Sequence, residues 1–269
     1  MEFGMFHEFP SLPGRTESEA FDEAIEQVDA AERLGLDVMW LAELHFEPRR
    51  SLLSAPLSIA SAIAARTRRI KIGIAVQVLP LCHPLRLAEE AATVDHISGG
   101  RLILGIGSGW KQRDYDEYGY EFGTAGSRLD ALAESVPVIL DRLPKLSPPP
   151  TRHIPLLIAG TGHRKTLPMV ARYADAWHAA FPDEPAEVAS DAARLRECCD
   201  AIGRDPESIE WSVGLQPNAL VRDLTYADDY VKLGFTQFTL GVGGPEFGLS
   251  AVPAWLAWRD ERNVSSKRM

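Results

Sequence analysis

One stretch carries the clearest signal of fold in this chain: Gly99-Gly-Arg-Leu-Ile-Leu-Gly-Ile-Gly-Ser-Gly-Trp110. A glycine pair ends a helix, and the apolar run Leu102–Leu104 that follows is typical of a buried strand. Glycines then alternate at the carboxyl end of that strand, the end at which parallel α/β proteins bind ligands. Two interpretations stay open here: backbone that approaches a flat ligand, or a barrel interior packed tightly enough to need small residues.

Strands and helices are expected to alternate on both sides of this stretch. Strands are expected at residues 2–7, 38–42, 70–76, 155–159, 176–180, 209–215 and 235–240. Helices are expected from Glu19 to Gly35 and at residues 55–66, 85–97, 128–140, 163–173, 184–202, 226–233 and 253–262. About eight alternations in this length favour an α/β fold of the closed (β/α)8 TIM-barrel type, as a single domain over residues 1–269. We expect residues 111–127 to form a polar, aromatic-rich loop.

Composition limits the classes of partner. The net charge is −10 and the pI about 5.2, which argues against nucleic acid and anionic membranes as partners. No apolar run approaches the ~18 residues of a membrane span, and the amino terminus lacks a secretory pattern. Three cysteines without metal-like spacing are consistent with a reducing cytoplasm.

Histidines and aromatic residues gather where the expected strands end. Residues at such ends are His7, Glu43, His45, Trp110, Trp177 and His178. In a barrel these ends face one common mouth, so the side chains are candidates for an active site. The spacing of the histidines and the glutamate matches no helical metal-ligand motif, so no metal site is predicted.

A glycine turn follows the fifth strand. Gly160-Thr-Gly162 precedes an expected helix whose first turn is His163-Arg-Lys-Thr166. Free amides at a helix start, with basic side chains beside them, form an anion site suited to phosphate. The alternative is an ordinary glycine turn with basic residues at the surface.

Together these motifs resemble the bacterial luciferase-like flavin-dependent oxidoreductases, the luciferase-like monooxygenase family of TIM barrels. The resemblance rests on residues 30–43, 67–73, 83–90, 95–101, 105–110 and 171–177, taken in that order. Each motif is weak alone, whereas the ordered set covers most of the chain. The resemblance implies that the chain binds FMN or, as in one branch of the family, the deazaflavin coenzyme F420.

The resemblance also implies where the cofactor lies. Ala75, Val76 and Gln77 would back the flavin ring, with a cis peptide between Ala75 and Val76. The phosphate would lie near Gly160, Thr161 and Gly162 with Arg164, and Gly107, Ser108 and Gly109 would be close to the cofactor.

Two departures from the family pattern bear on chemistry. The family's Glu-His-His-Phe motif reads Glu43-Leu44-His45-Phe46 here, so a leucine stands in place of a histidine implicated in luciferase catalysis. We therefore expect His45 to give acid–base assistance with Glu43 orienting or charging it; His7 or His178 could supply it instead, and His45 could be structural. The insertion between the fourth helix and the fifth strand is also shortened, to a proline-rich connection at residues 143–154.

The leading functional hypothesis is a monooxygenase that uses reduced FMN from a separate reductase, with O2, to oxygenate a small organic substrate. Val76, Trp110, Trp177 and His178 would then wall the substrate pocket. Hydride transfer with coenzyme F420 is an alternative, in which Lys111, Arg113, Arg164 and Lys165 would bind the cofactor's acidic tail. A non-catalytic flavin-binding barrel is a third. The family also implies a homodimer, for which residues 52–65 offer an apolar face.

Overall fold

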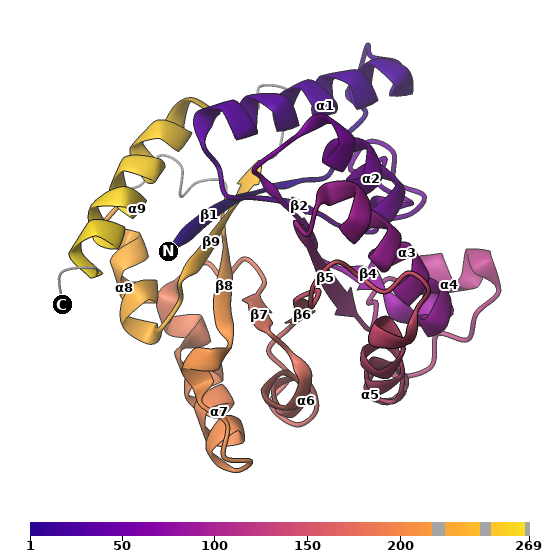
Figure 1. Cartoon of the computed structure of the whole chain (residues 1–269), viewed down its shortest axis with the longest axis vertical. Helices are drawn as coiled ribbons and strands as arrows, with labels where there is room; N and C mark the ends of the chain where they lie inside the picture. Colours follow the sequence, from indigo (N-terminus) through magenta and orange to yellow (C-terminus); the bar gives the residue numbers. More distant parts are fainter. Residues whose placement is uncertain (217–223, 243–248, 267–269) are drawn as a thin grey trace.

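The computed structural model describes residues 1–216, 224–242 and 249–266, and these form a closed barrel of parallel strands (Figure 1). The strands are β1 (Glu2–His7), β2 (Val38–Leu41), β3 (Lys71–Ile74), β4 (Gln77–Val78), β5 (Leu102–Gly107), β6 (Leu156–Ala159), β7 (Ala176–Ala179), β8 (Glu210–Leu215) and β9 (Gln237–Val242). The β1–β9 and β3–β5 pairings close the cylinder. The short β4 pairs with β5 beyond the end of β3, so eight positions make the barrel. The predicted TIM barrel is confirmed.

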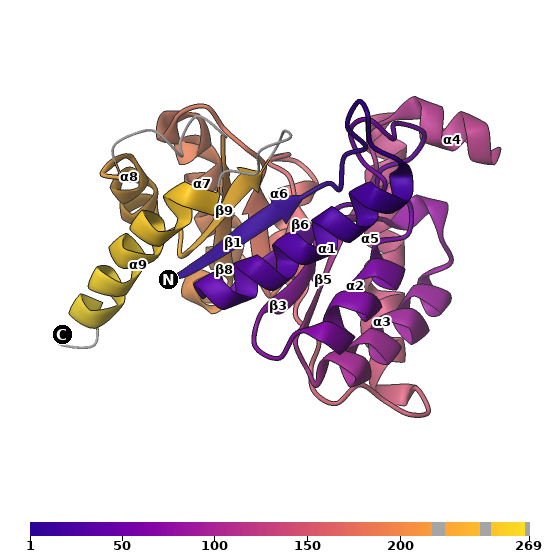
Figure 2. The ribbon, with the colours of Figure 1, turned by 90° about the horizontal axis from the view of Figure 1, so that it is seen from above.

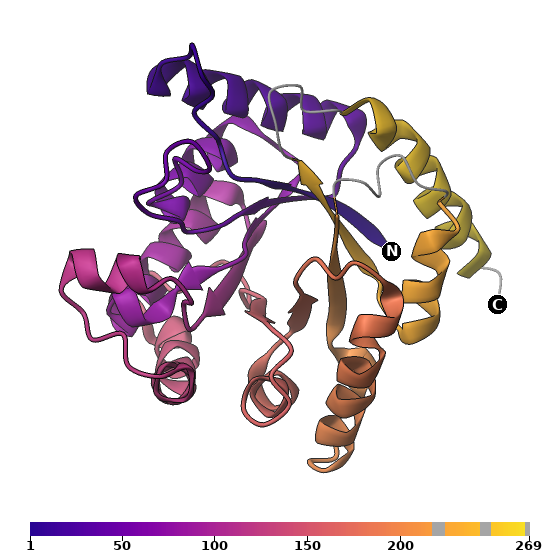
Figure 3. The same cartoon turned by 180° about the vertical axis from the view of Figure 1, so that it is seen from behind.

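Helices surround the strands. They are α1 (Glu17–Leu34), α2 (Pro56–Arg66), α3 (Pro84–Ser98), α4 (Gln112–Tyr118), α5 (Ala125–Arg142), α6 (Thr166–Tyr173), α7 (Pro185–Asp200), α8 (Tyr226–Leu233) and α9 (Val252–Ser266). Figure 2 shows α4 apart from the ring of helices, at the end of the barrel to which β1 points. In Figure 3, α9 lies between α1 and α8, and Asn263 on α9 accepts a hydrogen bond from the amino group of Met1.

Helix ends follow local chemistry. The hydroxyl of Thr16 accepts from the amide of Glu19, and the Glu19 carboxylate accepts from the Thr16 amide, so a capping box starts α1. Gly35 ends the same helix at φ 96°, a left-handed conformation that glycine adopts without strain. Pro84 occupies the first turn of α3, where its missing amide hydrogen leaves no bond unmade.

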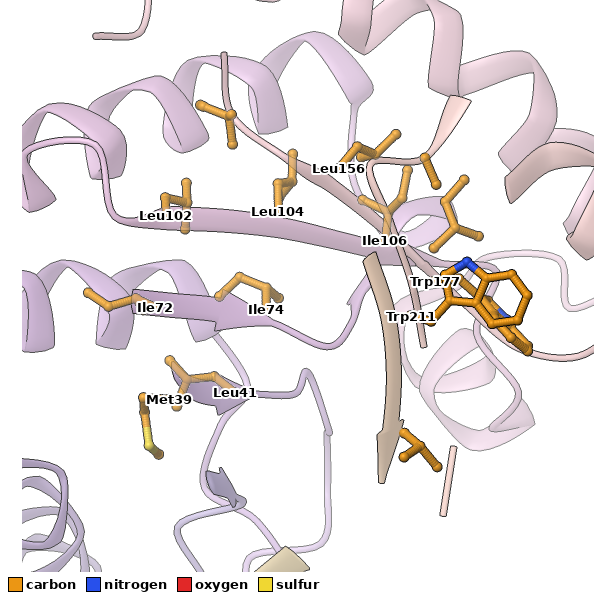
Figure 4. Close-up of a cluster of buried hydrophobic side chains, with 14 of the residues drawn as sticks. Met39, Leu41, Ile72, Ile74, Leu102, Leu104, Ile106, Leu156, Trp177 and Trp211 are labelled. Atoms are coloured by element: carbon orange, nitrogen blue, oxygen red, sulfur yellow. The ribbon is translucent and has the colours of Figure 1, made fainter. Parts of the chain in front are cut away.

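Two apolar layers hold the barrel together. The larger lies between strands and helices: Figure 4 shows Leu102, Leu104 and Ile106 of β5 along this outer layer, and Trp177 beside Trp211. The smaller fills the barrel with Val38, Trp40, Ile103, Leu157 and Ala176, and Phe6, Ala75, Val76 and Ala159 pack against it. Because side chains alternate along a strand, neighbours in sequence enter different layers.

Some expectations about elements need correction. The segment 111–127 is not all loop, because Gln112–Tyr118 forms α4, which ends at Gly119 with φ 72°. The helix expected from His163 begins instead at Thr166. In α2, Leu57, Ala60 and Ile63 are buried in the outer layer, so the predicted dimer face of residues 52–65 is largely core, and the homodimer itself stays a prediction.

The connection between α5 and β6 is short, as expected, with a 3-10 turn at Leu143–Lys145 and a cis peptide before Pro148. No helix among the described residues is long and apolar enough to cross a membrane. All three cysteines carry free thiols. In the described part of the chain, no three His, Cys, Asp or Glu side chains come together as a metal site requires.

Candidate functional site

A cavity of about 390 Å³ opens at the carboxyl ends of the strands. Its walls come from the ends of β1 to β7 and the loops that follow them. They comprise Phe6, Glu8, Ala42, Glu43, Leu44, Arg50, Ala75, Val76, Val78, Gly107, Ser108, Gly109, Trp110, Ala159, Gly160, His178, Ala180 and Phe181. Mostly apolar walls with a few polar groups are typical of a site for a small molecule or cofactor.

The chain bends sharply between β3 and β4, where the peptide bond joining Ala75 to Val76 is cis, as the resemblance implies. The Ala75 amide donates to the Leu41 carbonyl at 2.6 Å, and the Glu43 amide donates to the Val76 carbonyl at 3.1 Å. These bonds hold the bend against the loop after β2, and the side chain of Val76 lines the cavity.

The alternate glycines of β5 make room for this bend. A Cβ on Gly105 would lie 1.9 Å from the carbonyl oxygen of Ile74, and one on Gly107 would lie 2.6 Å from Cγ2 of Val76. Both distances are far inside van der Waals contact. At Gly105 and Gly107, close approach of protein to protein therefore explains the glycines, and the bend reaches the cavity because they are small.

Glu43 is the centre of the polar side of the cavity. Its Oε1 accepts from Nε2 of His45 at 2.8 Å, while its Oε2 accepts from the Gln77 amide group and the Val78 backbone amide, both at 2.5 Å. The side chains of Glu43 and His45 are 6% and 5% exposed, so this pair is almost fully shielded from water. The structure thus brings together three predicted site residues: Glu43, His45 and Gln77.

The positions of Glu43 and His45 differ from the expectation that His45 acts directly on the substrate. Glu43 lines the cavity, whereas His45 lies behind it and is not among the described residues that line the cavity. The hydroxyl of Tyr118 on α4 lies 3.1 Å from Nδ1 of His45, and Nζ of Lys111 donates to the His45 carbonyl at 2.9 Å. Sequence reasoning missed Tyr118 as a site residue, because the segment that carries it was expected to be a loop, and it expected Lys111 only as a partner of an acidic cofactor tail.

The other two histidine candidates lie in different layers. His7 points away from the cavity: its Nδ1 accepts from the Phe9 amide at 3.0 Å and its Nε2 contacts Oε1 of Gln27 on α1. His178 lines the cavity, and its Nδ1 is 2.8 Å from Oγ of Ser212. Burial lowers the pKa of both imidazoles to about 4, so both are neutral at pH 7.

The two tryptophan candidates also lie in different places, one at the cavity and one in the outer apolar layer. Trp110 lines the cavity and is 68% exposed at its rim, with the Arg50 guanidinium 6.0 Å from its ring centre. Trp177, expected in a substrate pocket, lies instead in the outer layer, fully buried, with its ring centre 5.2 Å from that of Trp211. Its Nε1 donates to the carbonyl of Gly160 at 2.9 Å, so it supports the glycine turn from outside the barrel.

The glycine turn after β6 is exposed and rich in free donors. Gly160 has φ 115°, and its amide donates to the His178 carbonyl at 3.0 Å. Within the described residues, the amides of Thr161 through Arg164 donate to no protein acceptor, and the Arg164 side chain makes no ion pair. The turn ends at the start of α6, where the helix dipole also favours an anion.

These features fit a flavin-type cofactor. The bend at Ala75 and Val76 and the strand end at Gly107–Gly109 line the mostly apolar cavity, and Gly160 links the same cavity to the turn of free amides. A planar ring in the cavity and a phosphate at the turn would use both parts.

Comparison with known proteins identifies the family. The sequence model of the luciferase-like monooxygenases matches residues 1–224. The chain belongs to this family. The predicted family is thereby confirmed, whereas activity, substrate, partner and the specific cofactor are not decided by membership.

Relatives within the luciferase-like family carry several names. The oxygenase component of a flavin-dependent trigonelline monooxygenase from Acinetobacter baylyi is 32% identical over 142 residues, 52% of this chain and 38% of that protein. Two uncharacterised proteins of Sinorhizobium fredii align over only 29% and 31% of their lengths, so this chain spans about a third of those relatives.

Solved structures agree on the fold. A monooxygenase from Streptomyces bottropensis superposes with a TM-score of 0.76 at 19% identity, over 94% of this chain and 96% of that one. An F420-dependent secondary alcohol dehydrogenase, solved with an F420–acetone adduct, also has a TM-score of 0.76, at 17% identity over 93% and 96%. At such identities the likeness concerns the fold alone.

Proposed function

We propose that this chain is the oxygenase of a two-component system, which receives reduced FMN from a separate reductase and uses O2 to oxygenate a small organic substrate. The observation that carries the proposal is the buried Glu43–His45 pair beside a mostly apolar cavity. The A. baylyi relative, named as an oxygenase component, supports the two-component arrangement.

The chain's first task is to hold the cofactor. Arg164 and the free amides of residues 161–164 would bind the phosphate. The bend at Ala75–Gln77 would support one face of the ring, with Gly107, Ser108 and Gly109 beside it. Reduced FMN, when bound, supplies the electrons that activate O2, a chemistry for which proteins rely on cofactors.

The second task is to exclude water. Phe6, Leu44, Val76, Val78 and Phe181 give the cavity an apolar wall. A dry wall keeps water from the reacting groups and strengthens each polar contact inside the site. Trp110 stands exposed at the rim, a position from which it could cover a bound substrate.

The third task is to hold a proton. Glu43 is the residue that lines the cavity, and Nε2 of His45 donates a hydrogen bond to its Oε1. Of the two residues, Glu43 is therefore the one placed to exchange a proton with substrate, and His45 is placed to orient it. His178 adds a neutral imidazole on the cavity wall.

Hydride transfer with coenzyme F420 is the second candidate, because an F420-dependent alcohol dehydrogenase shows that this barrel fold can also serve that chemistry. Of the four basic residues expected to bind the cofactor's tail, Lys111 pairs with Glu47 at 2.7 Å and Lys165 with Asp130 at 2.5 Å. Arg113 lies 3.8 Å from Glu117, so within the described residues only Arg164 is unpaired among the four. That charge arrangement favours a single phosphate over a polyanionic tail.

Reoxidation kinetics test the oxygenase proposal. The anaerobic complex with reduced FMN is mixed with O2 in a stopped-flow instrument, and free reduced FMN is the control. The proposal predicts that the bound flavin reoxidises in two resolved phases. A single phase at the rate of free flavin would contradict an oxygenase and favour a barrel that only stores flavin.

A further inference from the structure

A chain of hydrogen bonds joins a surface helix to the cavity. It runs from the hydroxyl of Tyr118, which is half-exposed on α4, through the buried His45 ring to the carboxylate of Glu43. Only Glu43, at its inner end, lines the cavity. The outer end lies on the helix that stands apart from the ring of helices (Figure 2).

The direction of each bond follows from what each group can donate. A carboxylate has no hydrogen to give, so His45 must donate from Nε2 to Oε1 of Glu43. A neutral imidazole carries one ring hydrogen, which leaves Nδ1 as an acceptor. When His45 is neutral, the Tyr118 hydroxyl therefore donates to Nδ1 across 3.1 Å, and both bonds favour the same tautomer of His45.

Residues at the start of α4 contact the loop after β2, the loop that carries His45, and these contacts hold Tyr118 in place. Lys111 reaches the carbonyl of His45 at 2.9 Å, and Arg113 donates to the carbonyl of Phe46 at 3.2 Å. The Arg113 guanidinium lies 5.5 Å from the ring centre of Phe46, and the Tyr118 ring lies 5.4 Å from it. Phe46 has φ 59°, a left-handed conformation that such packing must maintain.

We propose that Tyr118 is a positioning residue for Glu43. Through His45 it fixes the tautomer that donates to the cavity carboxylate, so the docking of α4 sets the proton arrangement at the site. A role for Tyr118 in catalysis rests on the proposed function. The tautomer of His45 and the docking of α4 do not depend on flavin and can be tested in the flavin-free protein.

The test is a long-range 1H–15N correlation spectrum of the histidine rings in uniformly labelled, flavin-free protein. The wild type is expected to show His45 protonated at Nε2, with Nδ1 shifted upfield by an accepted hydrogen bond. Tyr118→Phe keeps the ring and removes the hydroxyl, so the Nδ1 resonance should move downfield and the Nε2 hydrogen should exchange faster with water.

Tyr120→Phe is the matched control. Tyr120 is as exposed as Tyr118, 49% each, and its hydroxyl makes no hydrogen bond to the described part of the chain. Its spectrum should equal that of the wild type. A role in packing alone would leave the Tyr118→Phe spectrum unchanged, because the ring contacts remain.

Two results would overturn the proposal: a wild-type His45 protonated at Nδ1, or identical spectra for the wild type and Tyr118→Phe. Lys111→Met keeps the hydroxyl but removes a docking contact, and a smaller downfield shift is expected. An unchanged Lys111→Met spectrum would overturn the docking part. Because no flavin is present, these results stand apart from any failure of the proposed oxygenase to bind FMN.

Discussion

The Nε2 atom of His45 lies 2.8 Å from Oε1 of Glu43, and the two side chains are almost fully buried, Glu43 in the cavity wall and His45 behind it. Both residues lie in the loop that follows β2, and Glu43 is the member that lines the cavity. The motif Glu-Leu-His-Phe therefore retains a carboxylate–imidazole pair although Leu44 replaces a histidine of the family pattern.

Glu43→Gln should destabilise the fold, because both carboxylate oxygens accept hydrogen bonds. His45 donates to Oε1, and Gln77 and Val78 donate to Oε2, so a glutamine would place its own NH2 against a donor. One unmet donor in a buried site costs about 1–3 kcal/mol of unfolding free energy. Urea denaturation measures the loss.

Glu8→Gln is the control for that measurement. Glu8 also lines the cavity, but its side chain is 23% exposed and pairs with the half-exposed Arg50. We expect a change below about 1 kcal/mol. Equal losses in the two variants would show that the hydrogen bonds of Glu43 contribute nothing beyond those of a rim carboxylate.

Gly107→Ala should disturb the cavity wall. The new methyl group would lie 2.6 Å from Cγ2 of Val76, so the bend after β3 must shift and FMN affinity should fall at least about 10-fold, equivalent to 1.4 kcal/mol. Gly126→Ala in α5, whose nearest contact is 3.6 Å away, should leave affinity unchanged. Fluorescence titration with FMN measures both, and unaltered affinity in Gly107→Ala would place the ring elsewhere.

Arg164→Met separates phosphate binding from ring binding. The unpaired Arg164 should contribute to FMN affinity but not to riboflavin affinity, so FMN binding should weaken about 10-fold and riboflavin binding should not change. Lys165→Met is the control, because Lys165 already binds Asp130 and the Gly126 carbonyl. Equal weakening of both ligands by Arg164→Met would contradict a phosphate site at the turn.

Stability should fall in mild acid because of two buried histidines. Burial lowers the pKa of His7 and His178 from 6.5 to about 4, so the unfolded chain binds more protons between these values. Their stabilising contribution is complete above pH 6.5 and is lost as pH falls toward 4, by roughly 3 kcal/mol for each histidine. Urea midpoints across this range should depend less on pH in His7→Gln and His178→Gln, and an unchanged slope would contradict this account.

The barrel could be predicted because each strand and helix carries its own periodicity and its own ends. Gly35 and Pro84 marked helix boundaries that the structure confirms. The α4 helix was not predicted, because its seven residues are polar and aromatic and show no helical spacing of apolar side chains. The start of α6 was placed three residues early, because residues 163–165 form a turn before the helix at Thr166.

Side-chain direction explains the differences at the site. Trp177 and His178 are consecutive in β7, so only one of them can point into the barrel, and that one is His178. The same rule sends Phe6 to the cavity and His7 toward α1. The hydrogen bond from Tyr118 to His45 joins residues far apart in sequence, so no local pattern could reveal it.

The most direct test of the oxygenase proposal is an anaerobic titration of the purified chain with reduced FMN and, separately, with reduced coenzyme F420, followed by flavin absorbance and fluorescence. The account predicts that reduced FMN binds at least about 10-fold more tightly than reduced F420. Binding of F420 without measurable affinity for reduced FMN would contradict it and make hydride transfer the function of this barrel.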